Sequence, residues 1–289
     1  MDVDAAVALV RERRPDLDLT HAELTSPGWD YDVLITDEWV VRFPRRRDVG
    51  VKLVRELSLL PALRPRLPVA IPKVELRGVL PEGETQWAGY RRIPGDPVTA
   101  DLLTSARGGV ARSQIAGVLE ALADVPVREA VDIGLPAVDE GSWWAAQDGF
   151  VARVRDRVVP LLDAPGRSYA EAALAAYAEL PRAFTPRLLH GDFHRGHLLC
   201  DHERGTITGV IDWSGAQIGD PALEAAQLAD ELPPDLVAAL LPDYDDPHLW
   251  DRARCYQRFF PLEEALHGLT VNDARLLERG LRNATVAPS

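Results

Sequence analysis

The chain has 289 residues, of which 46% are hydrophobic and 27% charged, a composition typical of a soluble folded protein with one large or two modest domains. Its 32 basic and 45 acidic side chains give a formal charge of −13. Residues 1–95 are balanced, with 15 of each sign, so residues 96–289 carry the whole excess of acid. This distribution disfavours nucleic-acid and anionic-membrane partners and favours a cationic one, although composition alone is better explained by a solvated acidic surface.

Cysteine content and the start of the chain indicate the compartment. The sequence contains two cysteines, Cys200 and Cys255, which excludes a disulfide framework and favours a reducing environment. The first residues lack the basic-then-apolar pattern of a signal peptide, and no apolar run reaches the roughly 18–20 residues that span a bilayer. We therefore expect a cytoplasmic protein without membrane segments, and we expect it to be a monomer.

The first part of the chain predicts a small sheet-rich lobe. Apolar spacing predicts helices and alternating or β-branched runs predict strands. The expected elements are a helix over 3–14, two strands within 34–43 joined at Asp37-Glu38, a helix over 51–63, and strands over 71–76 and 87–92. The Pro- and Gly-containing segment 94–97 breaks regular structure where the charge balance also changes. We therefore expect an N-terminal lobe over 1–93, with a hinge at 90–97.

The remainder, residues 98–289, predicts a larger helical lobe. Helical spacing is expected at 113–125, 142–162, 168–180, 221–232 and 250–285. One β-rich interruption covers residues 187–213. The expected fold class is therefore α+β, with a bilobal arrangement.

The β-rich interruption carries the chemistry. Strand-like residues flank a polar turn in a hairpin, and they place Asp192 and Asp212 near the open ends of what we expect to be neighbouring strands. Two carboxylates that converge in this way suit a metal-assisted transfer reaction. One can accept a proton from a nucleophilic hydroxyl while the other holds a cation.

Two short motifs in this hairpin resemble those of a known family. They are His190-Gly191-Asp192 with His197 five residues after the Asp, and Ile211-Asp212-Trp213 followed by Gly219-Asp220-Pro221. With both motifs in this order, the chain resembles the aminoglycoside and macrolide antibiotic phosphotransferases, which have a bilobal protein-kinase-like fold. The resemblance implies that Asp192 orients or deprotonates the acceptor hydroxyl. It also implies that His197 and Asp212 hold Mg²⁺ against the nucleotide phosphates.

One position departs from the usual pattern of the family. The residue after the catalytic loop is generally Asn, an oxygen donor that suits Mg²⁺, whereas His197 offers nitrogen. Some macrolide kinases and some aminoglycoside 2″-kinases are similar in having His there. The resemblance is therefore nearest to the aminoglycoside 2″- and macrolide 2′-phosphotransferase branches. Asp220 is expected to cap a helix whose first position is Pro221.

The density of ligand-type side chains also permits a zinc site. Its candidate ligands are His190, His194, His197, Cys200 and His202. Such a site would leave both Asp192 and Asp212 without a role, so we favour the phosphotransferase interpretation. For His190 we expect hydrogen bonds to the loop backbone.

The nucleotide is expected in the N-terminal lobe. A P-loop kinase is excluded because the G-x-x-x-x-G-K-[ST] pattern is missing from the sequence. The resemblance implies that the loop 26–32, beginning at Ser26, lies over the nucleotide. It further implies that Arg42, in place of the usual Lys, pairs with Glu56 to hold the α- and β-phosphates; the alternative is a surface ion pair. The hinge residues expected against the base are Tyr90, Arg91 and Ile93, with core packing an equal alternative for Tyr90.

The acceptor is expected in the helical lobe. Between Asp220 and Trp250 there are eight carboxylates and no Lys or Arg. Aminoglycosides carry several ammonium groups, which carboxylates lining a cleft could bind. The aminoglycoside 2″-kinases resemble this chain in having an acidic pair near Asp230-Glu231 and a helix similar to residues 259–264, so the resemblance implies Asp230, Glu231 and Glu263 as acceptor contacts. For each of them taken alone, a solvated acid on a helix surface is the better explanation. A macrolide site would be apolar instead, and residues such as Trp143, Trp144, Trp250, Phe259 and Phe260 would either line it or form core.

These expectations combine into an enzyme that transfers the γ-phosphoryl group of GTP or ATP, with Mg²⁺, to an antibiotic hydroxyl. An aminoglycoside is the first expected acceptor, and GTP is expected to be at least a good donor. A macrolide 2′-phosphotransferase is the next interpretation. A metabolic small-molecule kinase of the same fold and a non-catalytic nucleotide binder remain open.

Overall fold

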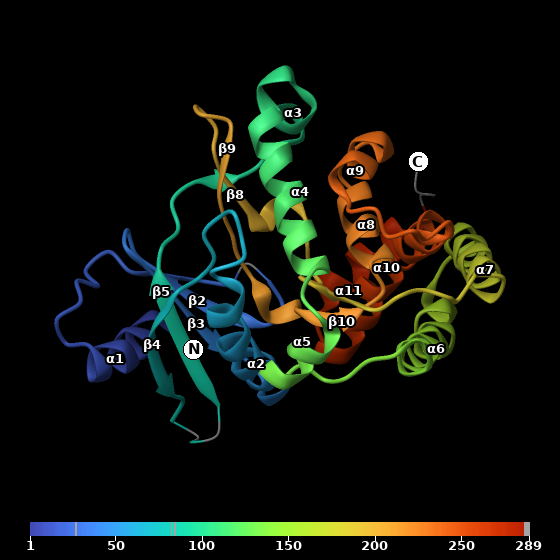
Figure 1. Ribbon diagram of the computed structural model, residues 1–289. Helices are drawn as coiled ribbons and strands as arrows, with labels where there is room; N and C mark the ends of the chain where they lie inside the picture. Colours follow the sequence, from blue (N-terminus) through green and yellow to red (C-terminus); the bar gives the residue numbers. More distant parts are fainter. Residues whose placement is uncertain (27, 82, 84, 286–289) are drawn as a thin grey trace. The chain divides into compact units, whose positions relative to one another are not determined.

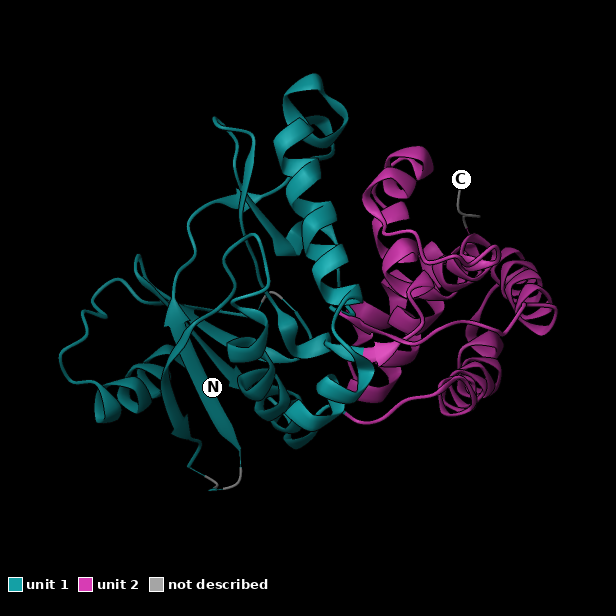
Figure 2. Ribbon diagram, viewed as in Figure 1, with its two compact units in different colours: residues 1–135, 190–217 teal, residues 136–189, 218–289 magenta. Residues whose placement is uncertain are grey.

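The computed structural model describes residues 1–26, 28–81, 83 and 85–285 (Figure 1). The chain forms two compact units, unit 1 with residues 1–135 and 190–217 and unit 2 with residues 136–189 and 218–289 (Figure 2). The predicted boundary between 93 and 98 would place the Asp192 hairpin with the helical part, whereas unit 1 includes this hairpin. The reason is strand pairing, because the segment after the hinge joins the hairpin in one sheet.

The elements follow the predicted α+β order. The helices are α1 Val3–Arg13, α2 Arg47–Leu63, α3 Ala100–Thr104, α4 Gly109–Ala123, α5 Val127–Ile133, α6 Glu140–Arg157, α7 Ala164–Ala178, α8 Ala222–Ala229, α9 Pro234–Leu240, α10 Leu249–Val271 and α11 Ala274–Asn283. The strands are β1 Glu23–Thr25, β2 Tyr31–Ile35, β3 Trp39–Pro44, β4 Val74–Val79, β5 Gln86–Arg91, β6 Asp96–Pro97, β7 Arg187–Leu189, β8 Leu198–Asp201, β9 Thr206–Val210 and β10 Gln217–Gly219. Short 3₁₀ turns include η3 Arg195–His197 and η4 Trp213–Gly215.

Unit 1 is built on a five-stranded antiparallel sheet with the order β1-β2-β3-β5-β4. Alternation along β3 sends Val41 and Phe43 to the face that packs on α1, while Arg42 points to the opposite face. That opposite face packs on α2 through Val49 and Leu53. Arg42 is therefore buried between the sheet and the helix that carries Glu56.

A second, three-stranded sheet of unit 1 has the order β6-β8-β9. β8 and β9 form the predicted antiparallel hairpin, with Leu198 opposite Val210. Segment 94–97, expected to lack regular structure, supplies strand β6 instead. Asp96 pairs with Cys200 of β8, because the chain leaves the hinge alongside the exposed edge of the hairpin.

Unit 2 is mainly helical, with a core between α6, α7, α8, α10 and α11. It also contains the two-stranded ribbon β7-β10. Trp143, Trp144 and Phe259 are buried in this core, and Trp250 and Phe260 pack against it. The predicted helix over 250–285 is two helices. It breaks at Asn272, whose φ of 58° is left-handed, and Asp273 then caps α11 by accepting the backbone N–H groups of Arg275 and Leu276.

A buried ionic network fixes several segments of unit 2. The Arg252 guanidinium donates to both carboxylate oxygens of Asp220, at 2.7 and 3.1 Å, and also binds Asp246. The hydroxyl of Tyr256 donates to Asp220 at 2.7 Å. Helix α8 begins at Ala222, one residue later than predicted, with Pro221 at the N-cap position. Asp220 still accepts the Ala222 N–H, but its carboxylate serves mainly as the partner of Arg252.

Within the described part of the chain, no helix combines the length and the apolarity that a bilayer crossing requires.

Candidate active site

The loop that carries Asp192 leaves β7 through a position that requires glycine. Gly191 has φ of 79°, and a Cβ atom there would lie 2.1 Å from the carbonyl oxygen of Gly215. The fully buried ring of His190 braces the same loop: its Nε2–H donates to the Ile211 carbonyl at 3.0 Å, and its Nδ1 accepts the Asp192 N–H at 3.3 Å. Burial lowers the pKa of His190 to about 3. His190 is therefore a neutral, backbone-bonded group, as expected from the sequence.

The side chains of His197 and Asp212 face each other. His197 Nδ1–H donates to the Asp192 carbonyl oxygen at 2.9 Å, which leaves the lone pair on Nε2. This Nε2 lies 3.7 Å from Asp212 Oδ2. The predicted pair of metal ligands is thus brought together, although by a different route. β7 pairs with β10 and β9 with β8, so Asp192 and Asp212 do not follow neighbouring strands of one sheet.

Asp212 occupies a strained position that its partners hold in place. Its φ of 60° and ψ of 66° are left-handed, which is uncommon for a residue with a side chain. Its Oδ1 accepts from Arg42 Nη2 at 2.7 Å and from the Ser214 hydroxyl at 2.9 Å. Although burial acts to raise its pKa, the charge of Arg42 and then that of His197 outweigh burial and hold the pKa well below the ordinary range. Asp212 is therefore an ionised carboxylate.

Arg42 and Glu56 form the predicted ion pair, and both are buried. Arg42 Nη1 donates to the two carboxylate oxygens of Glu56 at 2.7 and 3.0 Å. The ring of Tyr31 lies under the guanidinium, with its centroid 3.9 Å from Cζ. Burial raises the pKa of Glu56 to about 7 against the opposing charge of Arg42. The surface ion pair that was the alternative interpretation is therefore not what the structure shows.

The Asp192 carboxylate is open to solvent on one side, with its side chain 49% exposed. Its Oδ2 lies 3.5 Å from His197 Nδ1, and its Oδ1 lies 3.8 Å from His194 Nε2. Desolvation, which outweighs the two histidines, raises the pKa of Asp192 above its ordinary value. A half-exposed carboxylate with a raised pKa is suited to accept a proton from a hydroxyl.

The five candidate zinc ligands do not gather at one point. Within the described residues, the ligand-type atoms that gather within 4.8 Å of one another belong to Asp192, His194 and His197. His190 is engaged with backbone groups, and His202 Nε2–H donates to the Pro97 carbonyl at 3.1 Å. The five candidate zinc ligands therefore do not form one site.

Comparisons with known proteins agree with this arrangement. The model of the phosphotransferase enzyme family matches residues 22–257. The chain belongs to this family. It is also 30% identical to the viomycin phosphotransferase of Streptomyces vinaceus over 265 residues, covering 88% of this chain and 89% of that protein.

Solved phosphotransferase structures share the fold over nearly the full length of the chain. The complex of APH(2″)-IIIa with GDP and kanamycin is 25% identical, with a TM-score of 0.82 and 96% of each chain covered. The apoenzyme of macrolide 2′-phosphotransferase MphH from Brachybacterium faecium is 25% identical, with a TM-score of 0.71, covering 100% of this chain and 99% of that chain. The predicted family and fold are therefore confirmed.

The residues predicted for the base of the nucleotide lie on two faces of the phosphotransferase sheet. Tyr90 is buried on the same face as Arg42, and Ile93 is buried beside Gly209 of β9. The Arg91 side chain is on the other face, where it stacks on Trp39 at 4.3 Å. Arg91 can therefore meet a base only through its backbone.

The predicted covering loop, residues 26–32, spans the connection between β1 and β2 and includes the first two residues of β2, while Pro27 is outside the described residues. The Ser26 hydroxyl donates to Asp32 at 2.8 Å. Sequence reasoning did not single out the partners of the charged site, namely Tyr31 and Ser214. Tyr31 could have been found from the alternation of β2, and Ser214 from its place two residues after Asp212.

The three predicted acceptor carboxylates belong to unit 2. Asp230 is exposed at the end of α8, and Glu231 follows it. Partial desolvation by neighbouring protein atoms and then the charge of Glu231 raise the pKa of Asp230. Glu263 is exposed on α10. All three stay candidate contacts.

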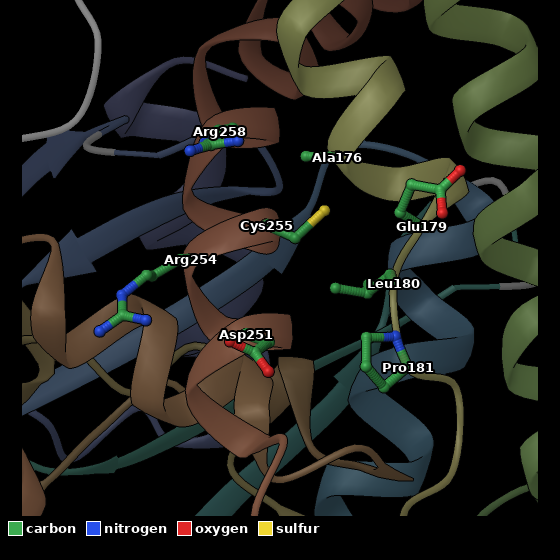
Figure 3. A pocket seen from close by; sticks show the side chains of 8 residues that line it. All are labelled: Ala176, Glu179, Leu180, Pro181, Asp251, Arg254, Cys255 and Arg258. Carbon is green, nitrogen blue, oxygen red and sulfur yellow. The ribbon is translucent and has the colours of Figure 1, made fainter.

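A separate pocket of unit 2, with a volume of about 410 Å³, lies between α7 and α10 (Figure 3). Its lining includes Leu180, Asp251 and the thiol of Cys255, whose pKa burial raises to about 11. The thiol is therefore neutral near pH 7. The lining contains none of the predicted catalytic or acceptor residues.

Proposed function

We propose that this phosphotransferase moves the γ-phosphoryl group of GTP or ATP to a hydroxyl of a polycationic antibiotic, either an aminoglycoside or a basic peptide of the viomycin type. The observation that carries the proposal is the charged centre of unit 1. There, a half-exposed Asp192 lies beside His197 and Asp212, and Asp212 is bound to the Arg42–Glu56 pair.

In the proposed reaction Asp192 accepts the proton of the acceptor hydroxyl. The hydroxyl oxygen forms a bond to the γ-phosphorus while the bond to the bridging oxygen breaks, and the nucleoside diphosphate leaves with that oxygen. Such transfer depends on positioning and charge neutralisation more than on covalent chemistry. The raised pKa of Asp192 suits it to take the proton as the hydroxyl attacks.

The residues present fit a divalent cation. Asp212 Oδ2 and the lone pair of His197 Nε2 are 3.7 Å apart, close enough to share one ion. Asp212 is ionised, and the hydrogen bond of His197 Nδ1 to the Asp192 carbonyl orients the ring. Mg²⁺ bound there would neutralise phosphate charge during transfer.

The polycationic acceptor is favoured by charge and by the two antibiotics associated with relatives of this chain. Kanamycin is bound in one solved neighbour, and viomycin is named for a relative. Both antibiotics carry several cationic groups. Asp230, Glu231 and Glu263 are proposed to bind these groups. Trp143, Trp144 and Phe259, the aromatic alternatives for an apolar macrolide site, are buried in the core of unit 2.

Turnover with a panel of acceptors tests the function. Kanamycin, viomycin and a macrolide are each offered with GTP and with ATP in the presence of Mg²⁺, and nucleoside diphosphate release is measured. We expect turnover with kanamycin or viomycin, and we expect Asp192→Asn to reduce kcat by about 10²–10⁴-fold. If only the macrolide is phosphorylated, the proposal that the acceptor is polycationic is wrong. If kcat of the Asp192→Asn variant equals that of wild type, Asp192 is not the base.

The acceptor residues are tested in the same assay. The Asp230→Asn/Glu231→Gln double variant should raise KM for the cationic acceptor and leave KM for the nucleotide unchanged. Glu171→Gln, an exposed acid on α7 of the same unit, serves as the matched control. An equal rise of KM in the control would show that general surface charge is responsible.

A further inference from the structure

The loop between β1 and β2 is tied to α2 by ion pairs. The Asp30 carboxylate binds Arg46 Nη2 at 2.6 Å and Lys52 Nζ at 3.2 Å. Arg46 has a second partner, because its Nε lies 3.3 Å from Asp48 Oδ1, whereas the ion pair with Asp30 is the one that holds Lys52. The Lys52 side chain is 45% exposed, so its ammonium group is accessible to a ligand.

Lys52 also lies toward the centre that contains Asp192 and Asp212. It is on α2, one helical turn before Glu56, and residues four apart on a helix are neighbours on one side. The Glu56–Arg42–Asp212 chain of ion pairs begins at that side. Helix α2 also contacts η4, the turn directly after Asp212. The charge of Lys52 acts on Asp192 and lowers its pKa against the larger, opposite effect of burial.

The buried cation of the site has its charge neutralised by the protein. Arg42 donates to Glu56 through Nη1 and to Asp212 through Nη2, and two carboxylates surround this single guanidinium. A triphosphate brings more negative charge than a diphosphate, and the additional charge is on the terminal phosphate. Mg²⁺ would offset part of this charge, and a side-chain cation that can leave its present partner would offset more of it.

We propose that Lys52 is this cation: it leaves Asp30 and binds the terminal phosphate of the nucleoside triphosphate. This inference rests on the proposed function. A terminal phosphate carries more charge and more acceptor oxygens than a carboxylate, so it competes for the three ammonium donors. Lys52 is then a triphosphate-specific contact, and Asp30 holds it near the site before the nucleotide binds.

The test compares binding of a non-hydrolysable GTP analogue with binding of GDP, by calorimetry with Mg²⁺, in Lys52→Met, Lys52→Arg and wild type. Lys52→Met should weaken binding of the analogue by about tenfold, the loss of one charge-assisted contact, while GDP affinity changes by less than about twofold. Lys52→Arg should restore most of the affinity. The chain offers a matched control in Lys73→Met, since Lys73 is the only other lysine of the sequence and is exposed near Glu75.

Each contrary result has a distinct meaning. Equal weakening of GDP and analogue binding by Lys52→Met would overturn the terminal-phosphate contact. Asp30→Asn removes the same ion pair but keeps Lys52, and it should retain affinity for the analogue. If Asp30→Asn weakens binding as much as Lys52→Met, the ion pair within the loop is what matters and the proposal fails. Failure of the wild type to bind any nucleotide would overturn the proposed function itself.

Discussion

Backbone groups fix the tautomers of two histidines near Asp192, with different chemical consequences. His190 uses both ring nitrogens for backbone groups and is fully buried, so it is a neutral structural residue. His197 uses only Nδ1 for a carbonyl and keeps the Nε2 lone pair toward Asp212. The same residue type therefore serves as a brace at one position and as a candidate ligand at another.

The neutral state of His190 makes stability dependent on pH. Its pKa is lowered from 6.5 to about 3 in the folded protein, so the unfolded chain binds the extra proton between these values. Stability is therefore lost as the pH falls below about 6.5, by up to about 1.4 kcal/mol per pH unit. When the free energy of unfolding is measured in urea from pH 7 to pH 4, it should fall less steeply with decreasing pH in His190→Asn than in wild type. His202→Asn, at the β8–β9 turn, should keep the wild-type slope; matching slopes in wild type and His190→Asn would contradict the assignment.

The nitrogen donor of His197 should influence the choice of metal. Mg²⁺ prefers oxygen ligands, whereas Mn²⁺ accepts imidazole more readily. His197→Asn should therefore raise the ratio of kcat/KM measured with Mg²⁺ to that measured with Mn²⁺. His194→Asn is the control because its ring lies 4.1 Å from that of His197. If this ratio of kcat/KM values changes in the His194 variant and not in the His197 variant, the metal ligand is His194.

Residues that act locally could be predicted, and residues that act through the tertiary fold could not. Asp192 and Asp212 lie close to one hairpin, and their places beside its strands indicated a charged centre, whereas the role of His197 came from the resemblance to a family. Arg42 and Glu56 came from the resemblance to a family. Lys52 had no sequence signal, because its contact with Asp30 depends on how α2 lies against the preceding loop.

At the scale of elements, short strands and breaks were the hardest to predict. β1 and β10 have three residues each, too few for a period-two pattern to be recognised. The break at Asn272 separates two helices that both contribute apolar residues to the core of unit 2, so periodicity alone suggested one helix. Long helices and the hairpin were predictable because their patterns repeat several times.

The turn from β7 into the Asp192 loop depends on the backbone of one residue. Gly191→Ala combines a positive φ with an overlap against the Gly215 carbonyl, whereas Gly134→Ala has a positive φ of 120° and nothing within 4 Å. The Gly134 variant should lose on the order of 1–2 kcal/mol from backbone strain, and the Gly191 variant should lose more. Chemical denaturation measures both free energies of unfolding. If the two variants lose the same free energy of unfolding, the overlap of the Cβ atom added in Gly191→Ala with the Gly215 carbonyl oxygen is relieved without a cost in stability.

At the scale of the whole molecule, unit 2 depends on a buried charge network more than its composition suggests. Arg252 is fully buried and joins α10 to Asp220, to the Asp246 loop and to the Ala183 carbonyl. Nothing in its helical spacing marked it as buried. The acid-rich segment after β10 is therefore held in part by a cation from a distant helix, in addition to being a candidate for acceptor binding.

Removing this cation should destabilise unit 2 selectively. Arg252→Met leaves Asp220 buried without its charge partner, and such a loss costs about 3–5 kcal/mol. Hydrogen exchange should show faster exchange at α8 and α10, with little change in the five-stranded sheet of unit 1. Arg254→Met, on the exposed side of the same helix, is the control and should behave like wild type. Uniformly faster exchange across both units would contradict a local role.

The ribbon formed by β7 and β10 has a consequence for tolerance to insertion. The segment 190–217 begins directly after β7 and ends at the first residue of β10, and these two strands are paired. The entropy of closing this loop is therefore already offset by the pairing at its base. Within the loop, the β8–β9 ladder fixes the relation between His197 and Asp212. Additional residues at the distal turn, around Gly205, lie beyond that ladder, so the hairpin tip can vary in length while the chemical groups at its base keep their register.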